Sequence, residues 1–469
     1  MRMLNIHTGR LFMATALVML AGGLLLGVLS SQVYIFPQLF RESIGFSALR
    51  PMHVTSVMFW ILMGATGAVY SALEKITGKK PGITAVFQWL LWIVAGAGIY
   101  YSYFTGKFGG REYWEFDPVW ALPLAAAWLL FIVNFFRMVK GYRKWPVYMW
   151  MWMTGVVFFF FTFIENYLWL LPYFRDHFVT DMTIQWKVNG SLVGSWNQLL
   201  YGTAFFLMDR IRNDSSTGNS RLAFGMYFLG LFNLMFNWGH HIYTLPTENY
   251  VRYIAYGVSM TEWIIFARIV YTWKSAVTEA QKYLHRYPYL FLLAADVWVF
   301  INLGQGLLMS IPALNIYTHG THVTVAHAMG TTIGINTMIM LAACFEFFKG
   351  NCESAGWKPR LNKLFWMAQG SLLIFFLALN VAGIGKGIWQ MSDRQVPFRN
   401  MMMQLQPAFY LFVFAGILLM LALGGLCFAL LKRYFMCDWK TENTGTKIIK
   451  LKNHEQAIDI AGKHERKRA

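Results

Sequence analysis

The sequence predicts an all-α integral membrane protein with about twelve transmembrane helices. Of its 469 residues, 57% are hydrophobic and only 13% are charged, whereas a soluble chain carries about a quarter charged residues. Apolar stretches of about 20 residues, the length that crosses a bilayer as a helix, recur along the whole chain. Inside a bilayer every backbone N–H and C=O needs an internal partner, so these stretches must be helical.

The apolar stretches also predict where the spans lie. We expect spans at residues 11–36, 51–72, 84–104, 119–138, 148–171, 188–208, 222–242, 250–271, 288–310, 322–347, 363–384 and 406–432. The first has no small-residue cleavage site, so we expect it to be retained rather than removed as a signal peptide. Residues 1–434 then form one membrane domain, and residues 435–469 form a basic, poorly ordered tail.

The net charge of +18 follows the membrane topology and does not indicate nucleic-acid binding. Lysines and arginines gather after the even-numbered spans and in the tail, as the positive-inside rule expects for cytoplasmic segments. Both termini are therefore predicted to be cytoplasmic, in a bacterial inner membrane. The four cysteines fall near the same side, where reduced thiols are expected. No C-x-x-C-H motif occurs, so no haem is attached covalently.

Histidines from three separate spans share one predicted depth. His53 opens the second span, His240 and His241 close the seventh, and His327 lies one to two turns into the tenth. All four fall in the outer third of the membrane. Ionisable residues inside a bilayer are costly and usually functional, and neutral imidazole is the commonest metal ligand. The pattern therefore favours a haem or metal site.

The stretch "YTHGTHVTVAHAMG", Tyr317 to Gly330, carries the most specific spacing. His327 and Met329 are two residues apart, so they point about 200° apart on a helix and could ligate two cofactors on opposite sides. Both side chains are known haem axial ligands. For His319 and His322 we expect hydrogen-bonded interfacial residues, and we expect the same for His7, His177 and His285. Met329 could also be ordinary core filling, since the chain has 27 methionines.

Four segments resemble those of a known family. "THGTHVTVAHAMG" is similar to the THGT…AAHGH segment, "GHHIY" to the metal-binding histidine pair, "RPMHVTSVMFW" to the low-spin haem segment and "GGREYW" to the Gly-Arg-Glu loop of the haem-copper oxidase superfamily. Within it, the chain resembles the catalytic subunit of nitric oxide reductase over nearly its whole length. The resemblance implies the helical bundle of subunit I of these enzymes.

The resemblance also implies roles for individual residues. His53 would be an axial ligand of a low-spin haem b, and His327 the proximal ligand of a high-spin haem b. His240 and His241 would hold a non-haem iron or copper facing that second haem. By the same resemblance, Arg111 and Glu112 would lie near the haem propionates, where the family's glutamate helps to bind calcium. Glu262 takes a place like that of the family's buried glutamate beside the metal.

The sequence departs from the family at both haems. Met329 stands where the family has the second histidine of the low-spin haem, and His–Met ligation raises the reduction potential relative to bis-His. The alternative is that Met329 does not bind. In the sixth span, Gly190 and Gly194 align with the family's third metal histidine and a glutamate. Asn189 could substitute through its carbonyl oxygen, and a carboxylate such as Glu262 would suit iron. A further family glutamate reads as Gln198, which cannot titrate.

The sequence thus predicts a membrane haem oxidoreductase similar to nitric oxide reductase. A cytochrome c-bearing small subunit, or a soluble cytochrome or cupredoxin, would supply electrons at the outer loops, and a small diatomic gas, NO or O2, would be the substrate. The alternatives are dismutase-like NO chemistry, a terminal oxygen reductase, and a haem-binding electron carrier or NO sensor without catalysis. A transporter that uses histidine protonation would need a continuous path of acidic residues, which the sequence does not show.

Overall fold

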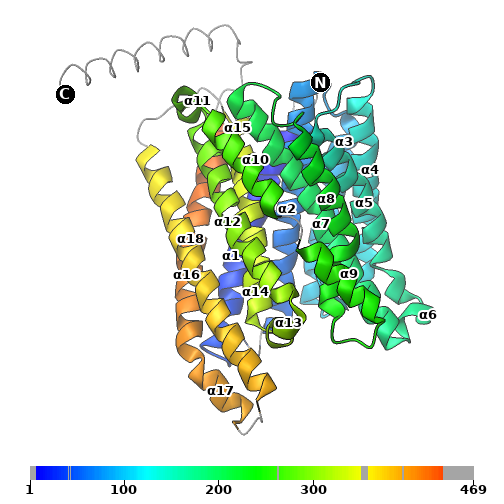
Figure 1. Cartoon of the computed structure of the whole chain (residues 1–469), viewed down its shortest axis with the longest axis vertical. Coiled ribbons are helices and arrows are strands. Elements are labelled where there is room, and N and C mark those ends of the chain that lie inside the picture. Colours follow the sequence, from blue (N-terminus) through cyan, green and yellow to red (C-terminus); the bar gives the residue numbers. More distant parts are fainter. Residues whose placement is uncertain are drawn as a thin grey trace, which may run out of the picture.

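The chain folds into a bundle of long helices (Figure 1). This computed structural model describes residues 7–436 except 41, 43, 261–262, 350–357 and 393–395. The first half contains α1 (Thr8–Ser31), α2 (Phe46–Thr77), α3 (Ile83–Phe104), α4 (Ala121–Val139), α5 (Val147–Glu165), α6 (Pro172–Arg175), α7 (Phe178–Arg212) and α8 (Arg221–Phe236). A short antiparallel hairpin, β1 (Phe108–Arg111) and β2 (Trp114–Phe116), joins α3 to α4.

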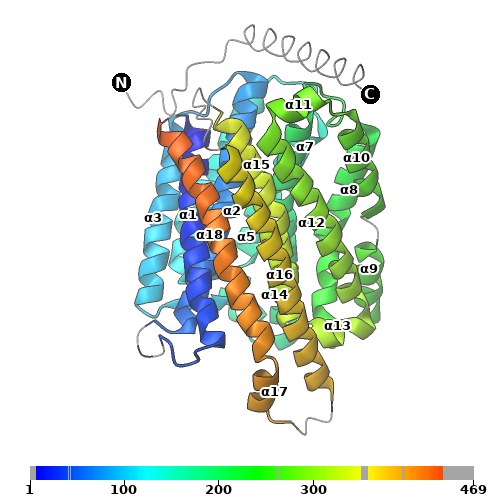
Figure 2. The same ribbon diagram turned by 90° about the vertical axis from the view of Figure 1, so that its left-hand side faces the viewer.

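The second half contains the segments that carry most of the histidines. Its helices are α9 (Asn249–Ser259), α10 (Trp263–Ala276), α11 (Glu279–Leu284), α12 (Arg286–Ser310), α13 (Pro312–Thr318), α14 (His322–Met329), α15 (Met338–Phe347), α16 (Lys358–Met391), α17 (Phe398–Gln404) and α18 (Gln406–Met436). A 3₁₀ helix, η5 (Asn237–Ile242), follows α8, and a π-helix, η6 (Gly330–Thr337), connects α14 to α15. Helices α16 to α18 extend beyond the others at one end (Figure 2).

The all-α membrane fold is confirmed. In the described part of the chain, ten helices are long and apolar enough to cross a membrane, and they correspond to ten of the twelve expected spans. The expected sixth span lies in α7, a single helix of 35 residues. The expected eighth span divides between α9 and α10, and the two residues between them lie outside the described part. The count of twelve therefore stays a prediction.

The ends of the bundle differ in charge. The first residue of α1 and the last of α18 lie at the same end (Figure 2). The last turns of α2, α4, α7, α10 and α18, which carry basic residues, are those that the positive-inside rule places in the cytoplasm. This arrangement agrees with the predicted cytoplasmic termini, which stay a prediction. The tail expected from residue 435 lies outside the described residues from 437 onward.

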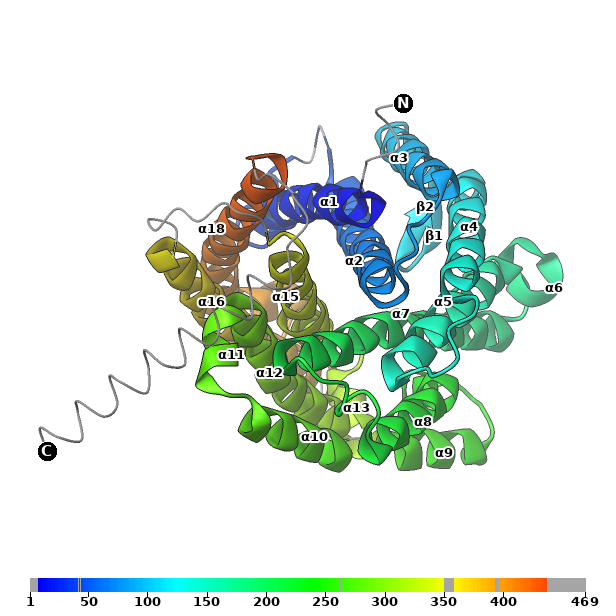
Figure 3. The same ribbon diagram turned by 90° about the horizontal axis from the view of Figure 1, so that it is seen from above.

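Helix α2 lies in the interior of the bundle, with α7 and α15 around it (Figure 3). It is the most buried of the ten spans. Its close neighbour is α1, because Gly9 and Gly67 face each other and a Cβ on either would collide with the opposite backbone. Between α2 and the π-helix, the Trp60 indole donates a hydrogen bond of 2.9 Å to the Thr337 hydroxyl. These contacts fix α2, and with it His53, against α1 and the tenth span.

A buried carboxylate ties three segments together at the basic end. Glu346, near the end of α15, has a side chain only 1% exposed. It accepts hydrogen bonds from Arg210 of α7 (3.3 Å) and Lys349 (2.6 Å), and His285 Nδ1 lies 2.8 Å away. A charged carboxylate in this position needs these partners, because the desolvation of an unpaired charge is expensive. His285 is thus a hydrogen-bonded residue, as expected from the sequence.

Replacing Glu346 by glutamine is expected to destabilise the bundle by about 2–3 kcal/mol. That is less than the roughly 3–5 kcal/mol for breaking a fully buried pair, because the Arg210 and Lys349 side chains keep 33% and 24% exposure. The measurement is reversible unfolding of the protein in mixed detergent micelles. Glu279→Gln is the matched control, since Glu279 is 78% exposed in its pair with Lys282 and should change stability by about 0.5 kcal/mol or less. Equal effects of the two variants would contradict the assignment.

Candidate haem and metal site

His53 packs against α1 in the space that Gly27 leaves open. A Cβ on Gly27 would lie 2.8 Å from Cε1 and Nδ1 of the imidazole. One turn earlier, the carbonyl of Gly23 accepts a hydrogen bond of 2.7 Å from His53 Nδ1. Because a carbonyl oxygen can only accept, Nδ1 carries the proton and the lone pair is on Nε2. Haem and metal ligands are commonly oriented by such a hydrogen bond on their other ring nitrogen.

Met329 lies at the same height as His53. Helices α2 and α14–η6 run in the same direction, and the Trp60–Thr337 hydrogen bond marks a common level. His53 precedes Trp60 by seven residues and Met329 precedes Thr337 by eight, so both lie roughly 10 Å from this level, toward the end of the bundle opposite the two termini. Met329 is partly buried against the hydrophobic core. The two side chains could thus bracket one flat cofactor.

His327 lies on the other side of the tenth span, against α12. A Cβ on Gly306 of α12 would be 3.0 Å from Cε1 of the imidazole. The backbone after His327 is held by a short chain of hydrogen bonds: Asn302 donates to Thr331 (2.6 Å), and the Thr331 hydroxyl donates to the His327 carbonyl (3.2 Å). The π-helix begins immediately after Met329, and π-helical segments occur frequently at functional sites.

The histidine pair lies in η5, and the imidazole of His319 lies close to it. The ring centroids of His240 and His241 are 4.2 Å apart, and His319 lies 5.8 Å from His241. The indole of Trp186, on α7, stacks on His241 with centroids 4.7 Å apart and planes within 8°, and it meets His319 edge-on at 5.4 Å. His241 Nδ1 and His319 Nε2 are buried, and neither has a hydrogen-bond partner within the described residues.

The expectation for His319 as an ordinary interfacial residue was wrong, whereas that for His322 is confirmed. His319 belongs to the imidazole cluster because it directly follows α13, which ends at Thr318 and contacts η5 where the Asn315 amide donates to the His240 carbonyl (3.3 Å). His322 Nε2 instead lies 3.3 Å from the hydroxyl of Tyr34, and its ring packs on Phe409. Residue spacing could not separate these two histidines.

The expected third metal-ligand position is closed. Trp186, Gly190 and Gly194 follow one another at intervals of four residues on one face of α7, the face that meets η5 and α8. A Cβ on Gly190 would lie 2.7 Å from Cβ and 3.3 Å from Cα of Trp238, and a Cβ on Gly194 would lie 3.2 Å from Cα of Leu234. The backbones are too close there for a histidine or a glutamate.

Asn189 and Gln198 are buried polar side chains beside this face. Both are 3% exposed. The side-chain atoms of Asn189, and Oε1 of Gln198, find no hydrogen-bond partner in the described ranges. Asn189 could therefore still offer an oxygen atom to a ligand, as predicted. Glu262, the expected carboxylate, lies outside the described residues.

Arg111 and Glu112, at the turn of the β1–β2 hairpin, lie beside different charged partners. Arg111 is held by both carboxylate oxygens of Asp181 on α7, at 3.0 and 2.9 Å, and lies 4.9 Å from the ring of Trp169. Glu112 lies 4.0 Å from Arg50, which also forms an ion pair with Glu115.

Arg50 stands three residues before His53, so this charge cluster borders the slot of that histidine. Burial raises the pKa of the Glu115 carboxyl, while Arg50 acts in the opposite direction. A calcium ion at Glu112 stays a prediction.

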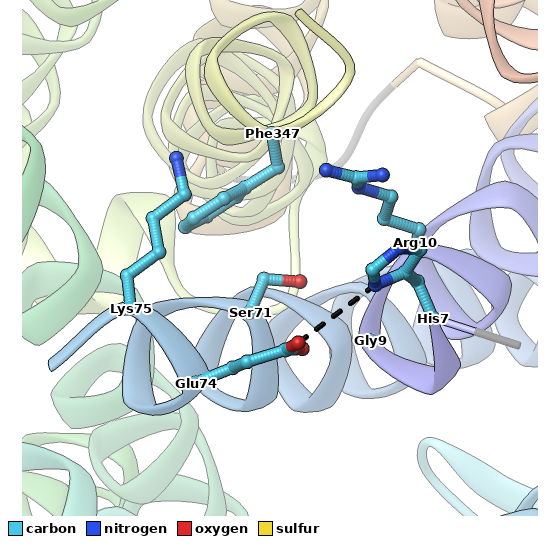
Figure 4. Close-up of a pocket in the computed structure, with 7 residues that line it drawn as sticks. All are labelled: His7, Gly9, Arg10, Ser71, Glu74, Lys75 and Phe347. Carbon is cyan, nitrogen blue, oxygen red and sulfur yellow. Dashed lines mark ion pairs between the residues drawn. The ribbon is translucent and has the colours of Figure 1, made fainter. Parts of the chain in front are cut away.

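One further pocket opens at the opposite end of the bundle (Figure 4). His7, Arg10 and Lys75 line it with Glu74 and Phe347, and His7 pairs with Glu74 at 3.8 Å. His7 thus lies beside a carboxylate at a helix end, and its expected hydrogen bond stays a prediction. Because this pocket lies at the end of the bundle away from the imidazole cluster, it is not part of the candidate site.

Comparison with known proteins decides the family. The model of the family "Cytochrome C and Quinol oxidase polypeptide I" matches residues 7–430. The chain belongs to this family. A nitric oxide reductase subunit of Stutzerimonas stutzeri is 22% identical over 441 residues, covering 87% of this chain and 90% of the relative. Cytochrome c oxidase subunit 1 of Rhodobacter capsulatus is 22% identical over 400 residues, covering 80% and 74%.

A solved structure supports the same fold. A haem-copper terminal oxidase dimer matches with a TM-score of 0.69 at 15% identity, over 92% of this chain and 85% of that one. The expected subunit I-like bundle is therefore confirmed. Members of the haem-copper oxidase family are oxidoreductases that bind haems and a copper or iron at a binuclear centre.

The residues fit the haems better than the non-haem metal. His53 and His327 each pack against a glycine of a neighbouring helix, Gly27 of α1 and Gly306 of α12. The hydrogen bond on Nδ1 of His53 leaves its Nε2 available to an iron ion. At the histidine pair, by contrast, no group of three His, Cys, Asp or Glu side chains among the described residues is arranged to hold a metal ion. The closed position at Gly190 accounts for the lack of a ligand from α7.

Gly27→Ala is expected to displace the His53 ring and to remove about one of two bound haems. The added Cβ would overlap the imidazole, whereas the helix itself tolerates alanine well. Haem content per chain and the low-spin visible bands are the measurements. Gly22→Ala is the matched control, because a Cβ at Gly22 meets nothing within 4 Å. Full haem retention in Gly27→Ala would show that His53 is not a ligand.

Gly190→His is expected to destabilise the protein instead of restoring a metal site. Overpacking of a close contact costs about 1–3 kcal/mol or more, and here the new side chain meets the backbone of Trp238. Thermal unfolding and metal content of the purified variant test this. Gly225→His on α8, where a Cβ meets nothing within 4 Å, serves as the control. A stable Gly190→His protein with added iron or copper would refute the closed position.

Proposed function

We propose that the protein is a haem-containing respiratory oxidoreductase of the nitric oxide reductase type in a bacterial inner membrane. The observation that supports it is the pair of imidazoles at His53 and His327, each seated in a glycine-opened slot on opposite sides of the tenth span. The first would hold a low-spin haem b together with Met329. The second would hold a high-spin haem b whose other face looks toward the His240–His241 cluster. The haems supply one-electron chemistry and an open iron position for a diatomic ligand.

The chain's own residues would set how electrons enter. Ligation by Met329 would raise the potential of the first haem, which suits a high-potential donor such as a cytochrome c-bearing subunit, a soluble cytochrome or a cupredoxin. The β1–β2 hairpin, with Gly109 to Trp114, lies at the outer end beside His53 and is the natural docking region for that donor. Arg50, shared by Glu112 and Glu115, would face the propionates of the same haem.

A second candidate function is NO binding without reduction, as in an electron carrier or gas sensor. The closed contact between Gly190 and Trp238 favours it, because it removes the third imidazole of the metal site. The substitution of Gly194 and Gln198 for carboxylates also removes groups that could deliver the protons that NO reduction consumes. Both candidate functions require a haem on His327. They differ in whether the bound NO is reduced.

The haem that both candidate functions require is tested by a visible spectrum of the purified protein with and without NO. About two haems b per chain are expected, one of which changes its spectrum when NO is added to the reduced protein. His327→Ala should abolish that change while leaving the low-spin haem in place. A protein without haem would end the proposal. Consumption of NO with a reduced cytochrome c donor would favour the reductase, and binding without consumption would favour the sensor or carrier.

Met329→His is expected to lower the midpoint potential of the low-spin haem, because it converts His–Met to bis-His ligation. Axial ligands set haem potentials over a range of about 0.8 V, so the change should be readily resolved in a redox titration followed in the visible region. Met391→Leu on α16, where the side chain is 49% exposed, is the control. An unchanged potential in Met329→His would show that Met329 is core filling.

A further inference from the structure

The indole of Trp186 covers one face of the imidazole of His241. It lies one turn outward from Gly190 on the same face of α7 and stacks flat on His241, 4.7 Å between centroids. An indole offers one N–H donor and no lone pair for a metal. Since α7 cannot carry a larger residue at position 190, Trp186 is the side chain by which this helix contacts the histidine pair.

The same indole also fixes the position of His319. Trp186 meets His319 edge-on at 5.4 Å, and His319 lies 5.8 Å from His241. The three rings therefore contact one another in a triangle contributed by α7, η5 and the segment between α13 and α14. Aromatic contacts of this kind are worth about 0.5–1.5 kcal/mol each beyond burial. They orient both imidazoles without any metal.

Two ring nitrogens of this cluster lack partners. His241 Nδ1 and His319 Nε2 are buried and make no hydrogen bond within the described part of the chain. A buried polar atom without a partner costs about 1–3 kcal/mol, so such atoms usually serve a bound ligand or water. A neutral imidazole can donate from one nitrogen. Hydrogen-bond donors above a haem are one of the features that decide how it handles a diatomic ligand.

We infer that this cluster is a hydrogen-bonding haem pocket and not a binuclear metal centre. Trp186 is a positioning residue that holds His241 and His319, and these two imidazoles donate hydrogen bonds to the diatomic ligand on the haem of His327. Within the described ranges, no third His, Cys, Asp or Glu side chain completes a site for the family's non-haem iron or copper. This inference rests on the proposed haem at His327. In this pocket, N–H donors would take the place of the family's non-haem metal ion.

The first test is the metal content of the purified holoprotein. Haem is counted as its pyridine complex, and total iron and copper are measured by mass spectrometry. We expect one iron atom per haem and no stoichiometric copper. A third iron for every two haems, or one copper per chain, would overturn the inference while leaving the haem proposal standing. A chain without haem would instead remove the proposed function.

The second test is the ferrous NO adduct observed by electron paramagnetic resonance. Without a second paramagnetic metal, the NO complex at His327 should give the full signal of an isolated haem–NO species, one spin per high-spin haem. Loss of this signal by coupling to a neighbouring metal would contradict a haem-only pocket. This readout does not depend on turnover.

The third test addresses the three ring residues through the carbonyl stretch of the ferrous CO adduct. His319→Leu should shift this stretch by removing a donor. Trp186→Leu should broaden and shift it because the imidazoles lose their support, whereas Trp186→Phe should retain most of the wild-type band by keeping a flat ring. Trp366→Leu, at a 66% exposed position on α16, is the matched control. Unchanged bands in His319→Leu and Trp186→Leu, with haem still bound, would refute the roles of these residues.

Discussion

The close approach of helix backbones at glycine decides where this protein can place an imidazole ring. In α1, Gly27 leaves the space that the ring of His53 fills, and the Gly23 carbonyl accepts a hydrogen bond from its Nδ1. In α12, Gly306 leaves space for His327. In α7, glycine has the opposite consequence. The helix lies so close to Trp238 that no larger side chain fits at Gly190. Small residues let membrane helices pack closely, and here they both open and close ligand positions.

The polar side chains around the tenth span follow from the same packing. A polar group inside a bilayer needs a partner within the protein. Asn302 donates to Thr331, and Gln305 donates to the Val323 carbonyl and to Asn380 of α16. These bonds hold the helix on both sides of His327 and at the start of the π-helix. The wider turn of that π-helix changes the direction of residues after Met329, so Thr337 meets Trp60 while His327 faces α12.

The sequence predicted local features well and close tertiary contacts poorly. The length of the apolar stretches alone predicted the ten spans. The positions of His53, His240, His241 and His327 within their spans predicted that these four histidines lie toward one end of the bundle. The sequence also identified position 190 as the departure from the family. It could not show that His319 and Trp186 join the cluster, because their proximity depends on how α13 folds back and how α7 crosses η5. A tryptophan four residues before a glycine on α7 carries no such signal by itself.

The two halves of the site have consequently diverged to different degrees. At His53, the hydrogen bond to the Gly23 carbonyl leaves the Nε2 lone pair available, and in the proposed low-spin site the thioether of Met329 would take the place of the family's second histidine. At His240 and His241, the resemblance puts the family's third metal histidine at position 190, and there the close contact of Gly190 with Trp238 leaves no room for a larger side chain without a shift of the backbone. A ligand pair with no room for a third member from α7 cannot enclose a metal ion in the way its relatives do. What remains in the described residues is an aromatic-lined face on which His241 Nδ1 and His319 Nε2 have no protein partner, and in the proposed haem pocket these nitrogens would act on a ligand by hydrogen bonding.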